Sequence, residues 1–178
     1  ETIKASRIAG VSSETFSGLA HAAQMSGVAT QDLTTAVAKL SAMTPEMATR
    51  FRNVGINVNE ANGSFKSSNV LLGELAQKMS DAKNPADQTS IAVRALGEEG
   101  AKLVNMLKDG KKGLADAAAE AERLGVVVSE QAGVAAEKFN DDMARTALSV
   151  KGLTMAIGES IIEFMNQNGI MDTVRATI

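Results

Sequence analysis

Residues 10–14 read Gly-Val-Ser-Ser-Glu, and residues 27–31 read Gly-Val-Ala-Thr-Gln. Glycine adopts the left-handed conformation that ends a helix, and the apolar residue after it can close over the last helical turn. Serine or threonine then caps the next helix, and glutamate or glutamine suits its positive first turn. Looser versions of the pattern follow at residues 55–60 and 125–130. The recurrence predicts short helices joined by tight corners.

The placement of proline supports the same interpretation. The 178 residues include only 2 prolines, and both follow a capping residue, as Thr44-Pro45 and Asn84-Pro85. Proline is favoured at the first position of a helix, so each pair marks a helix start. We therefore expect a mainly α fold. The helices that we predict span residues 13–26, 31–43, 45–53, 69–82, 86–96, 98–109, 112–124 and 130–167.

One segment, residues 56–66, departs from the helical pattern. Ile56-Asn57-Val58-Asn59 alternates apolar and polar residues, and Asn62-Gly63 is the strongest short hairpin signal. We expect a small β-hairpin carried on the helical body. The β-branched run at residues 126–128 is a candidate third short strand.

The C-terminal segment has the most regular periodicity. Residues spaced alternately by four and three positions between 139 and 164 are mostly apolar, which is typical of a coiled-coil seam. A helix over residues 130–167 would be about 57 Å long at 1.5 Å per residue, longer than a domain of this size is wide. We therefore expect a multi-helix core over residues 1–128, a long helix over residues 129–178 that continues the core, and self-association between copies of the chain. The predicted self-association seam is Phe139, Met143, Val150, Leu153, Ile157 and Phe164.

The composition excludes several classes of protein. The chain has no Cys, so a disulfide scaffold and a thiolate metal site are both excluded. It has a single His and a formal net charge of −3, which argue against a histidine metal site and a dedicated nucleic-acid binder. No apolar run approaches the roughly 20 residues of a membrane span, and the first residues lack a signal-peptide layout. We expect no cofactor, no metal and no specific nucleic acid.

No catalytic motif emerges from the remaining polar residues. The lone His21 is interpreted as a surface or edge histidine, and adjacent acidic pairs such as Asp141-Asp142 point about 100° apart on a helix. The glycines form neither of the common phosphate-binding loops. The lysines at 108, 111 and 112 are interpreted as a solvated cluster. We expect no enzyme and no small-molecule substrate.

The order of segments resembles a known family. The motifs include Gly-Val-Ser-Ser-Glu-Thr-Phe at 10–16 and Ala-Leu-Gly-Glu-Glu-Gly-Ala-Lys-Leu-Val at 95–104. Seven such pieces in this order resemble the core region of tape measure proteins from tailed bacteriophages and prophages, over about residues 5–155. In chain order, the pieces are residues 9–16, 19–28, 54–63, 71–76, 95–104, 124–130 and 136–141.

The resemblance implies a structural virion protein. Tape measure proteins lie in the lumen of the growing tail tube, their length sets the number of tube rings, and they are ejected ahead of the DNA. It also implies the tail tube protein, tail assembly chaperones and tail-tip proteins as partners, and the host cytoplasm as the place of assembly. Because the sequence lacks a start Met, we expect a segment of a longer protein. The alternative is a non-catalytic helical binding module, such as an adaptor or a secreted effector domain.

Overall fold

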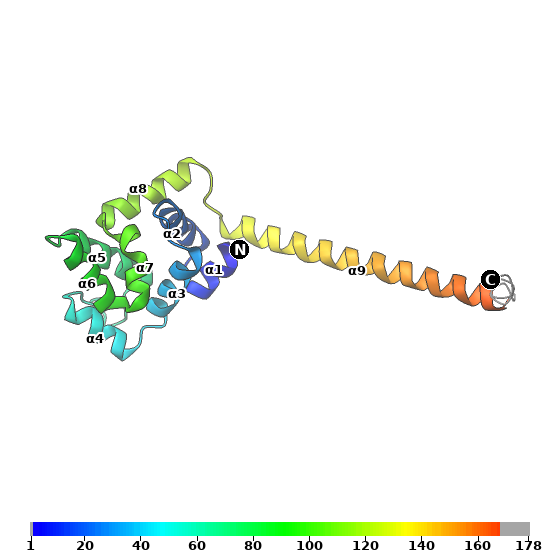
Figure 1. Cartoon of the computed structure of the whole chain (residues 1–178), viewed down its shortest axis with the longest axis horizontal. Coiled ribbons are helices and arrows are strands. Elements are labelled where there is room, and N and C mark those ends of the chain that lie inside the picture. Colours follow the sequence, from blue (N-terminus) through cyan, green and yellow to red (C-terminus); the bar gives the residue numbers. More distant parts are fainter. Residues whose placement is uncertain (1, 168–178) are drawn as a thin grey trace. The chain divides into compact units, whose positions relative to one another are not determined.

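The computed structural model describes the backbone of residues 2–167 and their side chains, except at residues 130, 133, 161, 162 and 164–167. Over this range the fold is all-α (Figure 1). The chain divides into two compact units, and the boundary falls between Gly133 and Val134. The helices are α1 (Thr2–Ala9), α2 (Ser13–Met25), α3 (Thr30–Ser41), α4 (Pro45–Asn53), α5 (Ser68–Ser80), α6 (Pro85–Leu96), α7 (Glu98–Leu107), α8 (Gly110–Arg123) and α9 (Glu130–Gln167).

The four predicted glycine corners are confirmed. Gly10, Gly27, Gly55 and Gly125 all have positive φ, between 68° and 83°. At each corner the next residue donates its backbone N–H to the carbonyl five residues earlier, as in Val28 to Ala23 at 2.8 Å. This is the hydrogen bond that a left-handed glycine makes possible at a helix end. The corners end α1, α2, α4 and α8.

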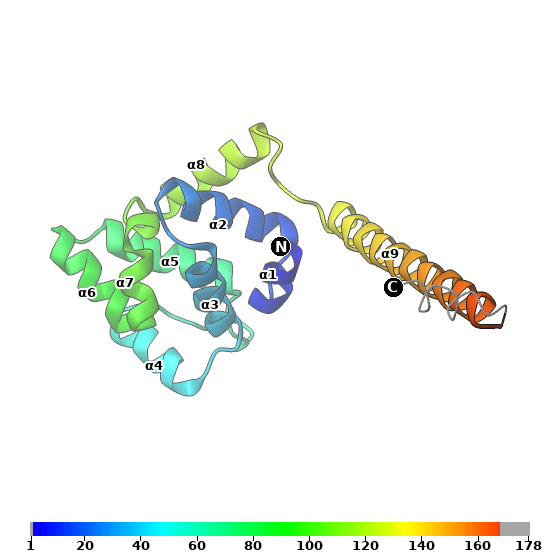
Figure 2. The same cartoon turned by 45° about the vertical axis from the view of Figure 1, so that its right-hand side comes forward.

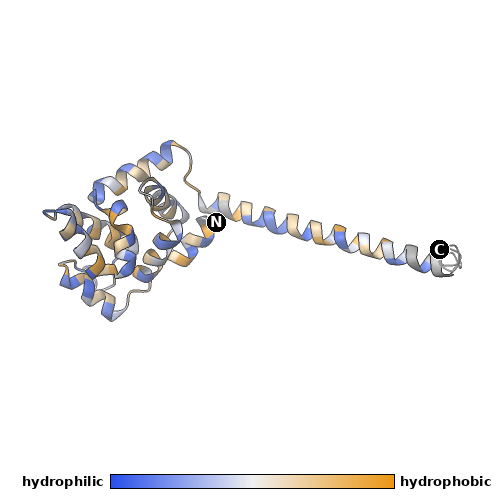
Figure 3. Ribbon diagram, viewed as in Figure 1, coloured by the Kyte–Doolittle hydropathy of each residue, from blue (hydrophilic) through white to orange (hydrophobic). Residues whose placement is uncertain are grey.

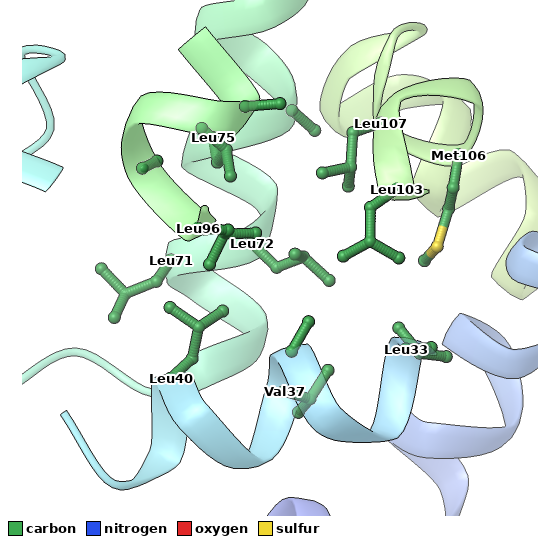
Figure 4. Packing of buried hydrophobic residues seen from close by; sticks show 14 of the residues in the cluster. Leu33, Val37, Leu40, Leu71, Leu72, Leu75, Leu96, Leu103, Met106 and Leu107 are labelled. Atoms are coloured by element: carbon green, nitrogen blue, oxygen red, sulfur yellow. The ribbon is translucent and has the colours of Figure 1, made fainter. Parts of the chain in front are cut away.

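The first unit packs its helices around one apolar core (Figure 2). Leucine side chains from α3, α5 and α7 point toward one another at its centre (Figure 4). Phe16 and Phe51 are fully buried and are the largest side chains in this core. Leucine and alanine make up most of the rest, and the alanines let helices approach closely. The labelled core residues are Leu33, Val37, Leu40, Leu71, Leu72, Leu75, Leu96, Leu103, Met106 and Leu107.

The predicted β-hairpin is not present. Residues 56–66 contain the expected turn, with Gly63 at φ 86°, but the described residues form no β-strand. The two arms share one isolated antiparallel bridge, between Asn59 and Phe65. Likewise, no strand forms at 126–128.

The two arms pair over a short length, with Glu60 N–H donating to the Ser64 carbonyl at 2.8 Å and Lys66 N–H to the Val58 carbonyl at 2.9 Å. Val58 on the first arm is fully buried in the helical core. Lys66 on the second arm pairs with Glu74 of α5 at 2.7 Å. A lone two-stranded hairpin is marginally stable in water, and these contacts hold both arms on the helical body. The Asn62-Gly63 signal fixed the turn but not the strands.

Candidate functional site

Helix α9 has a defined start. The Ser129 hydroxyl accepts a hydrogen bond from the backbone N–H of Ala132 at 3.2 Å, as an N-cap does. From there the helix runs for 38 residues to Gln167. Hydroxyls along it, including those of Thr146 and Ser160, donate to the carbonyl four residues earlier. These bonds satisfy the hydroxyl donors within the helix itself.

The predicted self-association seam lies on α9 and is open to solvent. Phe139 is 66% exposed, and Leu153 is 63% exposed. Met143, Val150 and Ile157 are also each more than half exposed. Phe164 belongs to α9, but its side chain lies outside the described residues. The second unit offers no other described element that could cover this face.

A second apolar stripe on α9 escaped the sequence analysis. Leu148 and Met155 are 69% and 62% exposed. At 100° per residue they point away from the seam, to the opposite side of the helix. The signal was present in the sequence, because these two residues are one heptad apart. A search restricted to steps of four and three follows one face and passes over the other.

The stretch of α9 that carries both stripes is almost free of charge. Between residues 146 and 158, Lys151 is the one charged residue. Charged residues lie on either side, with Asp142 and Arg145 before the stretch and Glu159 after it. The hydropathy colouring shows apolar residues recurring along the helix (Figure 3). A helix that is apolar over much of its circumference is normally enclosed by neighbours.

The first unit has a hollow of about 790 Å³ beside His21 of α2. Of the two expected placements, surface or edge, His21 takes the edge: its side chain is partly buried, 10% exposed. Its Nε2 lies 3.6 Å from Glu120 Oε2 of α8 and has no hydrogen-bond partner. Because that nitrogen is shielded from solvent, it is not available to a ligand in the open hollow.

Ion pairs join α3 to α7 on the surface of the first unit. Lys39 contacts Glu99 at 2.6 Å, and Lys102 contacts Asp32 at 2.7 Å. The hydrogen bond from Lys39 holds the pKa of Glu99 below its ordinary value. The hydrogen bond to Asp32 raises the pKa of Lys102. Both shifts come from the pairing of opposite charges and fit a structural role.

The remaining polar clusters form no recognisable site. The lysines at 108, 111 and 112 are exposed, and Lys112 pairs with Asp116 one turn further along α8. Among the described residues, no group of three His, Cys, Asp or Glu side chains is placed to hold a metal ion. None of the described helices combines the length and the apolar character needed to cross a bilayer. The seam of α9 is therefore the candidate functional surface.

Comparisons with known proteins do not assign the chain to a family. No protein-family model, no curated protein and no solved structure matches it.

Proposed function

We propose that this chain is a segment of a tape measure protein from a tailed bacteriophage or prophage. Support comes from the seven sequence pieces in the family's order and from the all-α fold with a long final helix. In this role the chain is a structural component of the tail tube lumen. It assembles in the host cytoplasm with the tail tube protein, the assembly chaperones and the tail-tip proteins. The proposal includes no catalytic activity, no cofactor and no small-molecule substrate.

The observation that carries the proposal is the exposed seam of α9. Its five described residues are each 53–66% exposed, as the side chains of a free helix face are. Burying an apolar side chain of this size contributes roughly 1.5–3 kcal/mol, so an uncovered seam is costly to leave in water. A second copy of the chain offers a matching face. A bundle of such helices is what a tail lumen requires.

Sedimentation tests the self-association directly. We expect the wild type to form concentration-dependent oligomers and the Val150→Asp, Ile157→Asp double variant to remain monomeric. The matched control, Leu148→Asp with Met155→Asp, places the same charges on the opposite stripe of the same helix. The control should retain association through the seam. A wild type that stays monomeric at high concentration, with its helix content intact, would contradict the proposal.

Measuring the length of phage tails tests the proposed role in tail length determination. A second copy of residues 137–164, four heptads, is inserted after residue 164 in the parent phage gene. If the segment is helical in the tail, the tail should lengthen by about 42 Å at 1.5 Å per residue. Electron microscopy of tails from wild-type and insertion phages gives the measurement. Viable phages with unchanged tail length would exclude a length-setting role for this segment.

One observation favours the alternative of a helical binding module. A groove of about 520 Å³ runs between α2, α5 and α8, with Leu19, Val70 and Leu114 in its wall. A groove of this kind suits an apolar peptide or helix. The two proposals differ in assembly, since a binding module has no need to self-associate. A monomeric wild type in the sedimentation experiment would therefore favour the alternative.

A further inference from the structure

The Asn62-Gly63 pair lies in the turn between the two arms of residues 56–66 and has no part in the proposed function. Both residues are exposed. Gly63 has a φ of 86°, and a Cβ placed on it would meet no atom within 4 Å. An asparagine followed by glycine is open to an internal reaction, because no side chain shields the glycine nitrogen from the asparagine amide. The chain has a second such pair, Asn168-Gly169, outside the described residues.

Ser64 holds the side chain of Asn62 over the turn. The Asn62 Oδ1 accepts a hydrogen bond from the Ser64 backbone N–H at 3.0 Å. The same oxygen accepts a second hydrogen bond from the Ser64 hydroxyl at 2.7 Å. Two donors therefore converge on the carbonyl oxygen of the side-chain amide, next to the backbone nitrogen that follows it.

We propose that Asn62 is a site of spontaneous deamidation and that Ser64 promotes the reaction. The Gly63 backbone nitrogen gives its proton to a solvent base and attacks the Asn62 Cγ, which forms a new N–C bond. Negative charge develops on Oδ1, the Cγ–Nδ2 bond breaks, and Nδ2 leaves as ammonia with the proton returned by solvent. The product is a cyclic succinimide.

Water is the only co-reactant, and it opens the succinimide ring in one of two ways. Attack at Cγ restores the peptide bond to Gly63 and leaves aspartate at residue 62. Attack at the backbone carbonyl breaks that peptide bond and leaves isoaspartate, in which the chain runs through the former side chain. Either product adds one negative charge to the turn. The proposal does not depend on how the chain assembles.

The two Ser64 donors lie where the charge of the reaction develops. Donors that are already aimed at an oxygen lower the barrier of acyl transfer when that oxygen becomes negative, as in the oxyanion holes of enzymes. In an exposed turn, water competes for the same oxygen and weakens the effect of each donor. Loss of the Ser64 hydroxyl should therefore slow the reaction by about three- to tenfold, less than the loss of one donor from a buried site.

One hydrogen bond opposes the reaction. The Gly63 N–H donates to the Glu60 carbonyl at 3.0 Å, and this bond must open before the nitrogen can attack. A single hydrogen bond of this kind slows the reaction by about tenfold or less. The space beside Gly63 is open, so no packed side chain has to move as well. The turn therefore restrains the attacking nitrogen through one bond and activates the attacked amide through two.

Other asparagines of the described chain lack this combination. Asn84 is followed by proline, which has no backbone N–H to attack with. Asn105 lies inside α7, where helical hydrogen bonds engage the backbone nitrogens. Asn57 and Asn59 are followed by valine and glutamate, whose side chains crowd the nitrogen. Among residues 2–167, Asn62 should therefore react first.

Peptide mapping by mass spectrometry measures the reaction at each asparagine of the full chain, incubated at mildly alkaline pH. The wild type should accumulate aspartate and isoaspartate at residue 62, and Ser64→Ala should do so about three- to tenfold more slowly. Ser64→Thr keeps the hydroxyl and should react like the wild type. The matched control, Ser67→Ala, removes a hydroxyl that donates to Asn69 Oδ1 and should leave the rate at residue 62 unchanged.

The chain unfolded in urea provides the reference. There the two Asn-Gly pairs should react at similar rates, and Ser64→Ala should lose most of its effect, because the donors are no longer held at Oδ1. A folded wild type without product at residue 62, when the unfolded chain reacts there, would overturn the proposed site. A folded Ser64→Ala variant that reacts as fast as the wild type or faster would overturn the role of Ser64, since its hydrogen bonds would then restrain the amide rather than activate it.

Discussion

The helices of the first unit and helix α9 follow the same sequence rules, but they differ in burial. The apolar faces in the first unit are buried, whereas that of α9 is exposed. In the first unit the core residues are at most 9% exposed. On α9 the described seam residues are at least 53% exposed. Both regions start helices with polar caps and place apolar residues at helical spacing. The difference teaches that periodicity reports an apolar face, whereas the partner of that face must be found by other means.

The space around the glycines differs between the two regions in the same way. A Cβ added to Gly100 of α7 would lie 2.0 Å from the carbonyl oxygen of Ala92 in α6. A Cβ added to Gly152 or Gly158 of α9 would meet nothing within 4 Å. Gly100 is thus required by close helix packing within the unit. Gly152 and Gly158 leave room that a neighbouring helix in an assembly can use.

The largest effect should come from exchanging phenylalanine for alanine in each region. Phe51→Ala empties a fully buried site and should cost about 3–5 kcal/mol of the free energy of unfolding. Phe139→Ala removes a side chain that is 66% exposed and should change it by about 0.5 kcal/mol or less. Urea unfolding of dilute protein, followed by circular dichroism, measures both. Equal destabilisation would mean that the face of α9 is already buried in the monomer.

The effect of a glycine-to-alanine substitution on stability should have opposite signs in the two regions. Gly100→Ala forces α6 and α7 apart and should destabilise the first unit by about 1–3 kcal/mol. Gly158→Ala has open space around it and should strengthen α9 by up to about 1 kcal/mol, since alanine is the better helix former. Thermal unfolding and the helical signal of each variant give the comparison. A neutral Gly100→Ala would show that the two helices can separate freely at Ala92.

Local signals were sufficient to locate most helices. Thr44 and Asn84 cap α4 and α6 as predicted, accepting hydrogen bonds from the backbone N–H of Met47 and Asp87. Helix α1 was not predicted, although Gly10 was identified as a helix-ending residue and a helix must precede it. Thr30 was expected to cap α3, but Ala29 occupies that position and Thr30 begins the helix. Such boundaries depend on which of two neighbouring residues has the extended backbone conformation of an N-cap.

Features that depend on tertiary competition could not be predicted from local patterns. Asn62-Gly63 formed its turn, but the pairing beyond it is a single bridge with short-range backbone hydrogen bonds, and Val58 packs into the helical core. The residues of the predicted seam on α9 were chosen by their spacing in the sequence alone. Leu148 and Met155 were missed because a heptad template describes one face. Spacing also does not say how many faces of a long helix will be covered.

Cap removal should produce a smaller, regional effect. Asn84→Ala deletes the 2.9 Å hydrogen bond to Asp87 and should cost the first unit about 1 kcal/mol. Ser129→Ala deletes the cap of α9 and should fray its first turn without changing the unfolding of helices α1–α8. Hydrogen exchange at single residues separates the two outcomes. Loss of protection across α4–α7 in Ser129→Ala would show that the two regions unfold together.

The smallest expected effect concerns pH and the pair of Glu99 with Lys39. The folded-state pKa of Glu99 is lowered, first of all by the hydrogen bond from Lys39. A carboxylate whose pKa is lower in the folded state stabilises the protein above its unfolded-state pKa. That contribution is lost as the pH falls through the folded-state pKa. Acid should therefore weaken the wild type more than Glu99→Gln, which carries no titrating group at this position.

The size of this effect is limited by solvent. The Lys39 side chain is 48% exposed, so water and salt screen the pair, and its contribution should be a few tenths of a kcal/mol. Urea unfolding at a series of pH values from 7 to below the pKa of Glu99 gives the difference between wild type and Glu99→Gln. The difference should shrink toward acid pH and also at high salt. Helix α9 provides the internal reference, because its helical signal should show no dependence on Glu99. Parallel pH curves for the two proteins would mean that the α3–α7 contact is held by packing alone.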